Sequence, residues 1–167
     1  VSGTASLSER TATLPKFALS FDKATIGASQ PLMLSLSDNV TRIGGTFSVN
    51  GGSIGLDASV SSGGPSASVH WNALPLELAR MAAVPLAAGT TSGTAQLGGE
   101  WSAATLSLDA GVDGLLLEGA AGEAPPLRAS LEANAGGNGI AFKTEGSMED
   151  AAAFDIEGSL AMPLSLR

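Results

Sequence analysis

His70 is the residue of this sequence best suited to acid–base chemistry, and it is the only histidine. It lies in the alternating stretch "SASVHW", and this alternation places it on the opposite side from the apolar Val69 and Trp71. A Ser-His-Asp site needs a histidine that is held by a carboxylate and faces a pocket. The Gly-rich stretch at 89–99 lacks the lysine and the spacing of a phosphate-binding loop. Neither feature predicts catalysis, and we expect that the protein is not an enzyme.

Residues that could bind a metal are equally sparse. The 167 residues include no cysteine, which excludes disulfides and thiolate metal sites. Carboxylates gather only in "MED" at 148–150, with Asp155 and Glu157 nearby. This grouping is more typical of a solvated loop beside an outward-facing strand than of a calcium site. We expect no metal and no cofactor.

The overall composition is acidic, apolar and regularly patterned. Eight basic and 16 acidic residues give a net charge of −8, which argues against binding nucleic acid or anionic lipid head groups. Apolar residues make up 44% of the chain, too many for a disordered linker. No apolar run approaches the roughly 18 residues that a membrane-spanning helix needs. The chain begins at Val1 and closes in a strand-like run, so we expect a single β-segment of a longer protein.

Residues 43–60, "IGGTFSVNGGSIGLDASV", predict a β-hairpin. Asn50-Gly51 is a strong two-residue turn signal because both residue types tolerate positive φ. The pairs set by this turn are Val49 with Gly52, Phe47 with Ile54, Gly45 with Leu56 and Ile43 with Ala58. One face of the hairpin is then apolar and the other polar. Six large apolar side chains at about 1.5–3 kcal/mol each require a cover, which could be a second sheet, a helix, a partner chain or an apolar ligand.

The same alternation recurs through most of the chain and predicts an all-β, mainly antiparallel fold. One segment, "LPLELARMAAVPL" at 74–86, has helical spacing instead, and we expect a short helix at about 75–84 that Pro85 ends. The predicted organisation is strands over 1–72, helix and linker over 73–86, and strands over 87–167. Such strands fit either a closed sandwich or barrel, or a long curved sheet that forms an open groove.

The apolar positions of the alternating strands are the candidate lining of such a groove. They are Phe17, Leu19, Phe21, Leu32, Leu34, Leu36, Ile43, Phe47, Val49, Ile54, Leu56, Val60, Val69, Trp71, Leu97, Leu106, Leu108, Val112, Leu127, Leu131, Ile140, Phe142, Phe154, Ile156, Leu160 and Met162. For Trp71 and Trp101, filling a core and closing a groove near the helix are both open.

Two motifs resemble a known family. Gly89 to Gly99 reads G-x-x-S-G-x-A-x-L-x-G between alternating strands, and residues 158–164 read G-S-L-x-x-P-L after a strand–Gly turn–strand rhythm. Residues 66–166 thereby resemble the TamB (translocation and assembly module) family of Gram-negative bacteria, within the AsmA-like superfamily.

This resemblance implies a β-taco, an elongated curved sheet with an open hydrophobic groove. It implies a periplasmic segment of an inner-membrane-anchored protein that carries phospholipid acyl chains toward the outer membrane. An Omp85-type outer-membrane partner would be reached through the full-length chain. The alternative is a chaperone-like scaffold that assists outer-membrane protein or autotransporter assembly. A passenger-type solenoid is a third alternative, although no fixed repeat is visible. Because two open apolar faces can bury each other, we also expect that the isolated fragment can dimerise.

Overall fold

The computed structural model describes residues 2–6, 9–21, 24–78, 86–117, 125–148, 151–162 and 164. These residues form twelve strands. They are β1 (Ser2–Ser6), β2 (Thr11–Lys16), β3 (Ala18–Phe21), β4 (Ala24–Ser37), β5 (Val40–Val49), β6 (Gly52–Ser61), β7 (Pro65–Pro75), β8 (Leu86–Glu100), β9 (Ala103–Leu117), β10 (Leu127–Gly136), β11 (Gly139–Met148) and β12 (Ala151–Leu160).

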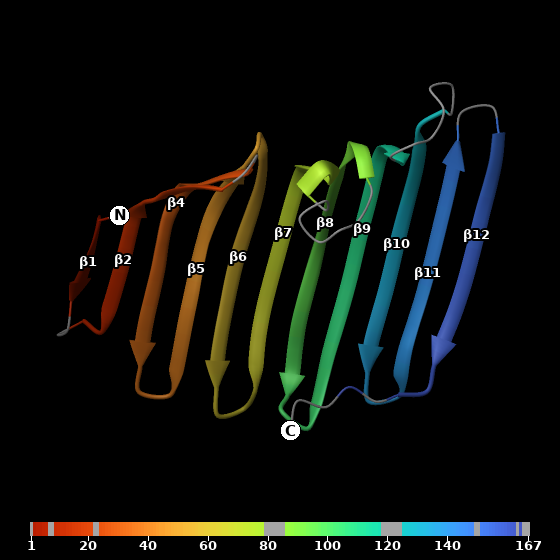
Figure 1. Ribbon diagram of the computed structural model, residues 1–167. Coiled ribbons are helices and arrows are strands. Elements are labelled where there is room, and N and C mark those ends of the chain that lie inside the picture. Colours follow the sequence, from red (N-terminus) through yellow and green to blue (C-terminus); the bar gives the residue numbers. More distant parts are fainter. Residues whose placement is uncertain are drawn as a thin grey trace.

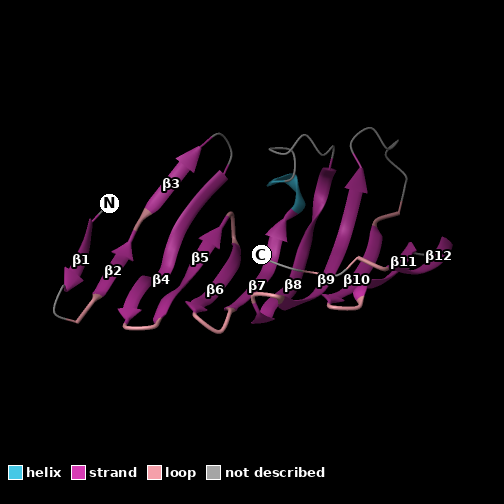
Figure 2. Cartoon of the chain, turned by 90° about the horizontal axis from the view of Figure 1, so that it is seen from below, coloured by secondary structure: helices cyan, strands magenta, loops and turns pink. Residues whose placement is uncertain are grey.

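All twelve strands belong to one antiparallel sheet in which neighbours in sequence are neighbours in space. The order is β1-β2-β4-β5-β6-β7-β8-β9-β10-β11-β12 (Figure 1), and β3 pairs with β4 beside the end of β2 (Figure 2). The prediction of an all-β, antiparallel fold is confirmed. No helix among the described residues is long and apolar enough to cross a membrane.

The predicted hairpin at 43–60 is present with the predicted register. Val49 pairs with Gly52 and Phe47 with Ile54 across the Asn50-Gly51 turn. Asn50 has a φ of 46° and Gly51 a φ of 90°, which is the positive-φ geometry that this dipeptide favours. The turn chemistry and the alternation therefore act together to fix which side chains share a face.

The helical prediction for 75–84 is only partly met within the described residues. Pro75 is still the last residue of β7 and pairs with Thr90 of β8. Residues 76–78 then form a single 3₁₀ turn, and residues 79–84 of the predicted helix lie outside the described part of the chain. At 75 the helix prediction is wrong, because the sheet register extends one residue beyond the point where the helical spacing begins.

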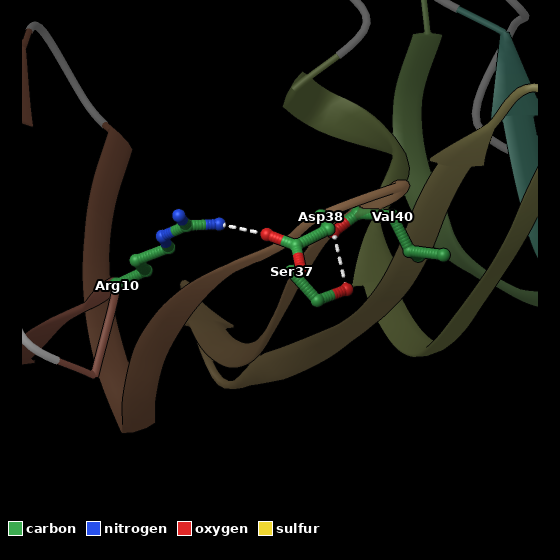
Figure 3. Close-up of polar contacts among 4 residues, drawn as sticks. All are labelled: Arg10, Ser37, Asp38 and Val40. Carbon is green, nitrogen blue, oxygen red and sulfur yellow. Dashed lines mark hydrogen bonds and ion pairs between the residues drawn. The ribbon is translucent and has the colours of Figure 1, made fainter.

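The turns at the opposite end from the 3₁₀ turn are short and held by polar contacts. Arg10, in the turn before β2, forms an ion pair with Asp38 in the β4–β5 turn (Figure 3). In the same turn the Ser37 hydroxyl donates a hydrogen bond to the Val40 carbonyl over 3.0 Å (Figure 3). Both acidic and basic partners are exposed, so this pair positions the turns more than it stabilises the fold.

The sheet is one layer and stays open, as the view from below shows (Figure 2). Among the described residues the buried apolar side chains are Val49 at 5% exposure, Ala104 at 0% and Pro65. The accessible surface of the chain is 10576 Å², whereas a compact monomer of 16.5 kDa exposes about 7,500 Å². Roughly 3,000 Å² more surface than a compact fold would expose therefore faces the surroundings.

Candidate functional site: an uncovered apolar sheet face

The register brings the apolar side chains of β4 to β12 onto one side of the sheet, because directly paired residues of antiparallel strands share a face. We call this side the apolar face. Its members are Ile26, Ala28, Leu32, Leu34, Leu36, Ile43, Phe47, Val49, Ile54, Leu56, Ala58, Val60, Ala67, Val69, Trp71, Ala95, Leu97, Ala104, Leu106, Leu108, Ala110, Val112, Leu127, Ala129, Leu131, Ala133, Ala135, Ile140, Phe142, Met148, Phe154, Ile156 and Leu160.

These side chains form rows that run across the strands, one of them apolar throughout and another that includes Gly93 and Thr144. One row of directly paired residues is Leu34, Ile43, Ala58, Ala67, Leu97, Leu106, Ala135, Ile140 and Leu160. A second is Ala28, Phe47, Ile54, Trp71, Gly93, Ala110, Leu131, Thr144 and Ile156. Each row spans nine strands, so the apolar face is a continuous surface and not a set of separate patches.

The apolar face is open to the surroundings. Leu106 keeps 39% of its surface exposed, Ile156 52% and Leu160 57%. In ordinary sheets such side chains are covered by a second layer. Within the described residues no second layer lies over them.

Three aromatic rings on the apolar face lie over glycines of the neighbouring strand. A Cβ added to Gly93 would lie 2.5 Å from Cζ2 of Trp71. Phe142 occupies the equivalent space at Gly158, with Cζ 2.5 Å away, and Phe154 does so at Gly146. Each ring therefore occupies the space that a side chain at the paired glycine would need.

The polar atoms that Trp71 and Thr144 contribute to this face are hydrogen-bonded within the sheet. The indole N–H of Trp71 donates a hydrogen bond to the Thr91 hydroxyl over 3.2 Å. Phe17, between β2 and β3, packs its ring against Phe47 with centroids 5.7 Å apart. From β4 to β12 the described charged side chains lie on the other side of the sheet, in the turns or in the 3₁₀ turn. The apolar face can therefore contact an apolar ligand, but none of its described side chains carries a charge that would orient that ligand.

The opposite side, here the polar face, carries the hydrophilic partners of the alternation. Lys143 forms ion pairs there with Glu145 and, at 3.9 Å, with Asp155. The hydrogen bond and charge of Glu145, followed by the charge of Asp155, raise the pKa of Lys143 above its ordinary value. A hollow of about 640 Å³ is lined on this side by uncharged groups that include Ser68, Gln96 and Asn134. The two faces thus differ completely in chemistry.

Every predicted lining residue on β4 to β12 lies on the apolar face, and Phe17 joins it through its contact with Phe47. Leu19 and Phe21 pair through their backbones with Ile26 and Ala24, and their side chains lie outside the described part. Met162 follows the end of β12 and lies outside the strands. The role of these residues in binding stays a prediction.

Some members of this surface were not among the predicted lining residues. Leu14 of β2 pairs with Leu32, and Ile26 of β4 pairs with Val49, so both extend the apolar side. The alternation of Ala12 and Leu14 in "ATLPK" indicates the face on which Leu14 lies. Ile26 is six residues before Leu32, so it is in phase with the alternation of the leucines that follow it.

The remaining candidates have structural positions. His70 pairs with Gly55 on the polar face, and its ring fills the space of the missing Cβ there. Trp101 lies in the β8–β9 turn and donates its indole N–H to the Ser61 carbonyl over 3.2 Å. This turn is at the other end of the sheet from the 3₁₀ turn, so Trp101 does not close a groove there (Figure 1). Of 148–150, only Met148 is described, and the described residues contain no group of three or more metal-binding side chains.

Comparison of the chain with protein-family models, with curated proteins and with solved structures found no match. The chemistry of the apolar face is therefore the basis on which a function can be assigned.

Proposed function

We propose that this chain is a hydrophobic segment of a periplasmic, TamB-like protein that carries phospholipid acyl chains between the inner and outer membranes. The observation that supports this proposal is the uncharged apolar face, which runs unbroken over nine strands and stays uncovered. An apolar surface of this kind is a binding site for apolar ligands or partners. Acyl chains meet the requirement because they need area and not directed polar contacts.

The dimensions of the face suit acyl chains. Neighbouring strands lie about 4.8 Å apart, so the rows from β4 to β12 are about 38 Å long. The hydrocarbon core of a bilayer is about 30 Å thick, which gives each lipid tail a length of about 15 Å. Two tails can therefore lie end to end along one row.

Movement along the face needs no chemical step. A buried methylene contributes about 0.8 kcal/mol wherever it lies on an apolar surface. A tail that shifts along a row therefore exchanges one apolar contact for another of similar strength. From β4 to β12 the described charged and amide side chains, which could select a head group, lie on the polar face, in the turns or in the 3₁₀ turn, so the apolar face would accept tails regardless of their head group.

Site-specific photocrosslinking in cells tests this proposal. A photoreactive residue at Phe47, on the apolar face, is compared with one at Ser48, on the polar face. We expect phospholipid adducts at Phe47 and none at Ser48. Adducts at Phe47 that form only within the same chain would contradict the lipid role and point to a closed core.

A second function is favoured by a different observation, the open edge at β12. Within the described residues this ten-residue strand pairs only with β11, and its sequence contains neither proline nor lysine, the residues that commonly protect edges. Such an edge can accept an extended strand by β-augmentation. This supports a scaffold that assists outer-membrane protein assembly with an Omp85-type partner through the full-length chain. Binding of outer-membrane strand peptides to β12 would support it, and no binding across a peptide panel would count against it.

A further inference from the structure

We infer that, in the absence of lipid, a second copy of this chain covers the apolar face, so that two sheets pack face to face as a sandwich. The inference does not depend on the proposed lipid function, because it follows from the uncovered surface alone. Three features of the structure support a second copy as the occupant.

The first feature is the area available. The apolar face extends about 38 Å across β4 to β12 and about 33 Å along strands of ten residues, so it covers roughly 1,200 Å². A stable interface needs about 800 Å² from each partner. Covering only part of the apolar face therefore meets the requirement of a stable dimer.

The second feature is the distribution of charge. The net charge of −8 opposes association of two copies wherever like charges meet. From β4 to β12, the described charged side chains lie off the apolar face. Face-to-face packing therefore directs the charges of both copies outward, toward solvent.

The third feature disfavours the other way in which two copies could join, edge to edge through β12. A two-fold antiparallel pairing centred on Ile156 places Asp155 opposite Glu157 of the partner strand, on both sides of the axis. Like charges directly opposite each other destabilise a sheet. This centred pairing of β12 with its own copy is therefore disfavoured, whereas no described charged side chain on the apolar face of β4 to β12 opposes a second copy.

The geometry predicts which residue lies at the centre of the dimer. β8 is the middle strand of the nine that carry the face, and Ala95 lies in its middle, paired with Val69 and Leu108. A two-fold axis parallel or perpendicular to the strands, with full overlap of the faces, brings Ala95 opposite its own copy. Packed sheets lie about 10 Å apart, within reach of a short bifunctional cross-linker.

The sequence contains no cysteine, so a single introduced cysteine is the only thiol with which a cross-linker can react. Ala95→Cys places a thiol at the centre of the apolar face, and Gln96→Cys places one on the polar face one residue away. Sedimentation velocity without lipid should give twice the monomer mass for both variants. A short bismaleimide should link two copies of Ala95→Cys covalently. It should form no covalent dimer of Gln96→Cys, which should run as a monomer on a denaturing gel.

Two results would overturn the inference: a monomer mass over the whole accessible concentration range, or cross-linking through Gln96→Cys and not through Ala95→Cys. Adding diheptanoyl phosphatidylcholine below its micelle concentration separates this inference from the lipid proposal. A dimer that this lipid dissociates supports both. A dimer that the lipid leaves intact supports the inference and counts against lipid carriage. A chain that is monomeric without lipid and binds the lipid counts against the inference and supports lipid carriage.

Discussion

The indole of Trp71 lies over Gly93 of the neighbouring strand, in the space that a side chain at Gly93 would need. A Cβ at Gly93 would lie 2.5 Å from Cζ2 of Trp71 and 2.3 Å from the Asp109 carbonyl oxygen. The second of these atoms belongs to the backbone and cannot move aside without disturbing β9. The position of the ring over β8 therefore depends on the absence of a side chain at Gly93.

Gly93→Ala should accordingly destabilise the sheet by about 1–3 kcal/mol, because the added methyl group displaces both the ring and the β8–β9 pairing. Gly98→Ala in the same strand is the matched control. Its Cβ would meet only the Thr105 hydroxyl at 3.9 Å, so stability should stay unchanged or rise by about 0.5–1 kcal/mol. Urea unfolding of the two variants measures the difference, and equal stabilities would show that the ring does not rest on Gly93.

Leu106→Arg should abolish acyl-chain binding and leave the fold intact. Leu106 is 39% exposed, so the arginine can reach solvent while its charge interrupts the apolar row. We expect at least a tenfold loss of bound lipid by native mass spectrometry, with an unchanged far-ultraviolet circular dichroism spectrum. Thr105→Arg, on the polar face, should keep its lipid. If Leu106→Arg unfolds the chain, the position belongs to a closed core.

Asn50 should stabilise the sheet through both its backbone conformation and its side chain. Its Oδ1 accepts a hydrogen bond from the Thr25 N–H over 2.8 Å, and its own N–H donates to the Thr25 carbonyl over 3.2 Å. Asn50→Gly retains the positive φ and should cost about 1 kcal/mol for the lost hydrogen bond. Asn50→Ala should cost about 1 kcal/mol more because its φ of 46° is unfavourable for alanine. Thermal unfolding that ranks the two variants in the other order would contradict this assignment.

The ion pairs of Lys143 should stabilise the β11–β12 pairing in a pH-dependent manner. The neighbouring carboxylates of Glu145 and Asp155 raise the pKa of Lys143 in the folded sheet. The stabilisation by these ion pairs is therefore fully present below the ordinary lysine pKa of about 10.4. It is lost as the pH rises through the higher pKa that Lys143 has in the folded sheet. Lys143→Met should lower the Tm at neutral pH and differ little from the parent chain in strong alkali. A difference that persists in alkali would show that Lys143 acts through packing of its aliphatic part.

The sequence was sufficient to predict the strands, the Asn50-Gly51 turn and the face on which each apolar residue lies. Those features depend on neighbouring residues, since alternation and turn chemistry are local. Two findings depend on the pairing of distant strands and were not predictable in this way. One is the irregular pairing at Gln30 in β4, which places this residue opposite Thr46 on the polar face although alternation puts it in phase with Ala28 and Leu32. The other is the placement of rings over glycines, which requires the register between strands.

The 3₁₀ turn shows a similar limit. Helical spacing at 74–86 predicted a helix, but the pairing of Pro75 with Thr90 keeps the chain in the sheet up to that residue. A local periodicity thus yields to a neighbouring strand where the two overlap. The uncovered state of the apolar face is also a property of the whole sheet, because the same alternation suits a closed sandwich equally well.

From β4 onward, each strand pairs with the strands directly before and after it in the chain. Stability in such an array resembles a sum of contributions between adjacent units, as in repeat proteins. The length of the apolar surface is therefore adjustable in steps. Inserting or deleting one hairpin between β4 and β12 would lengthen or shorten every row by two strands, about 10 Å, without altering the chemistry of the rest. The number of hairpins alone therefore sets the distance over which such a sheet offers continuous apolar contact.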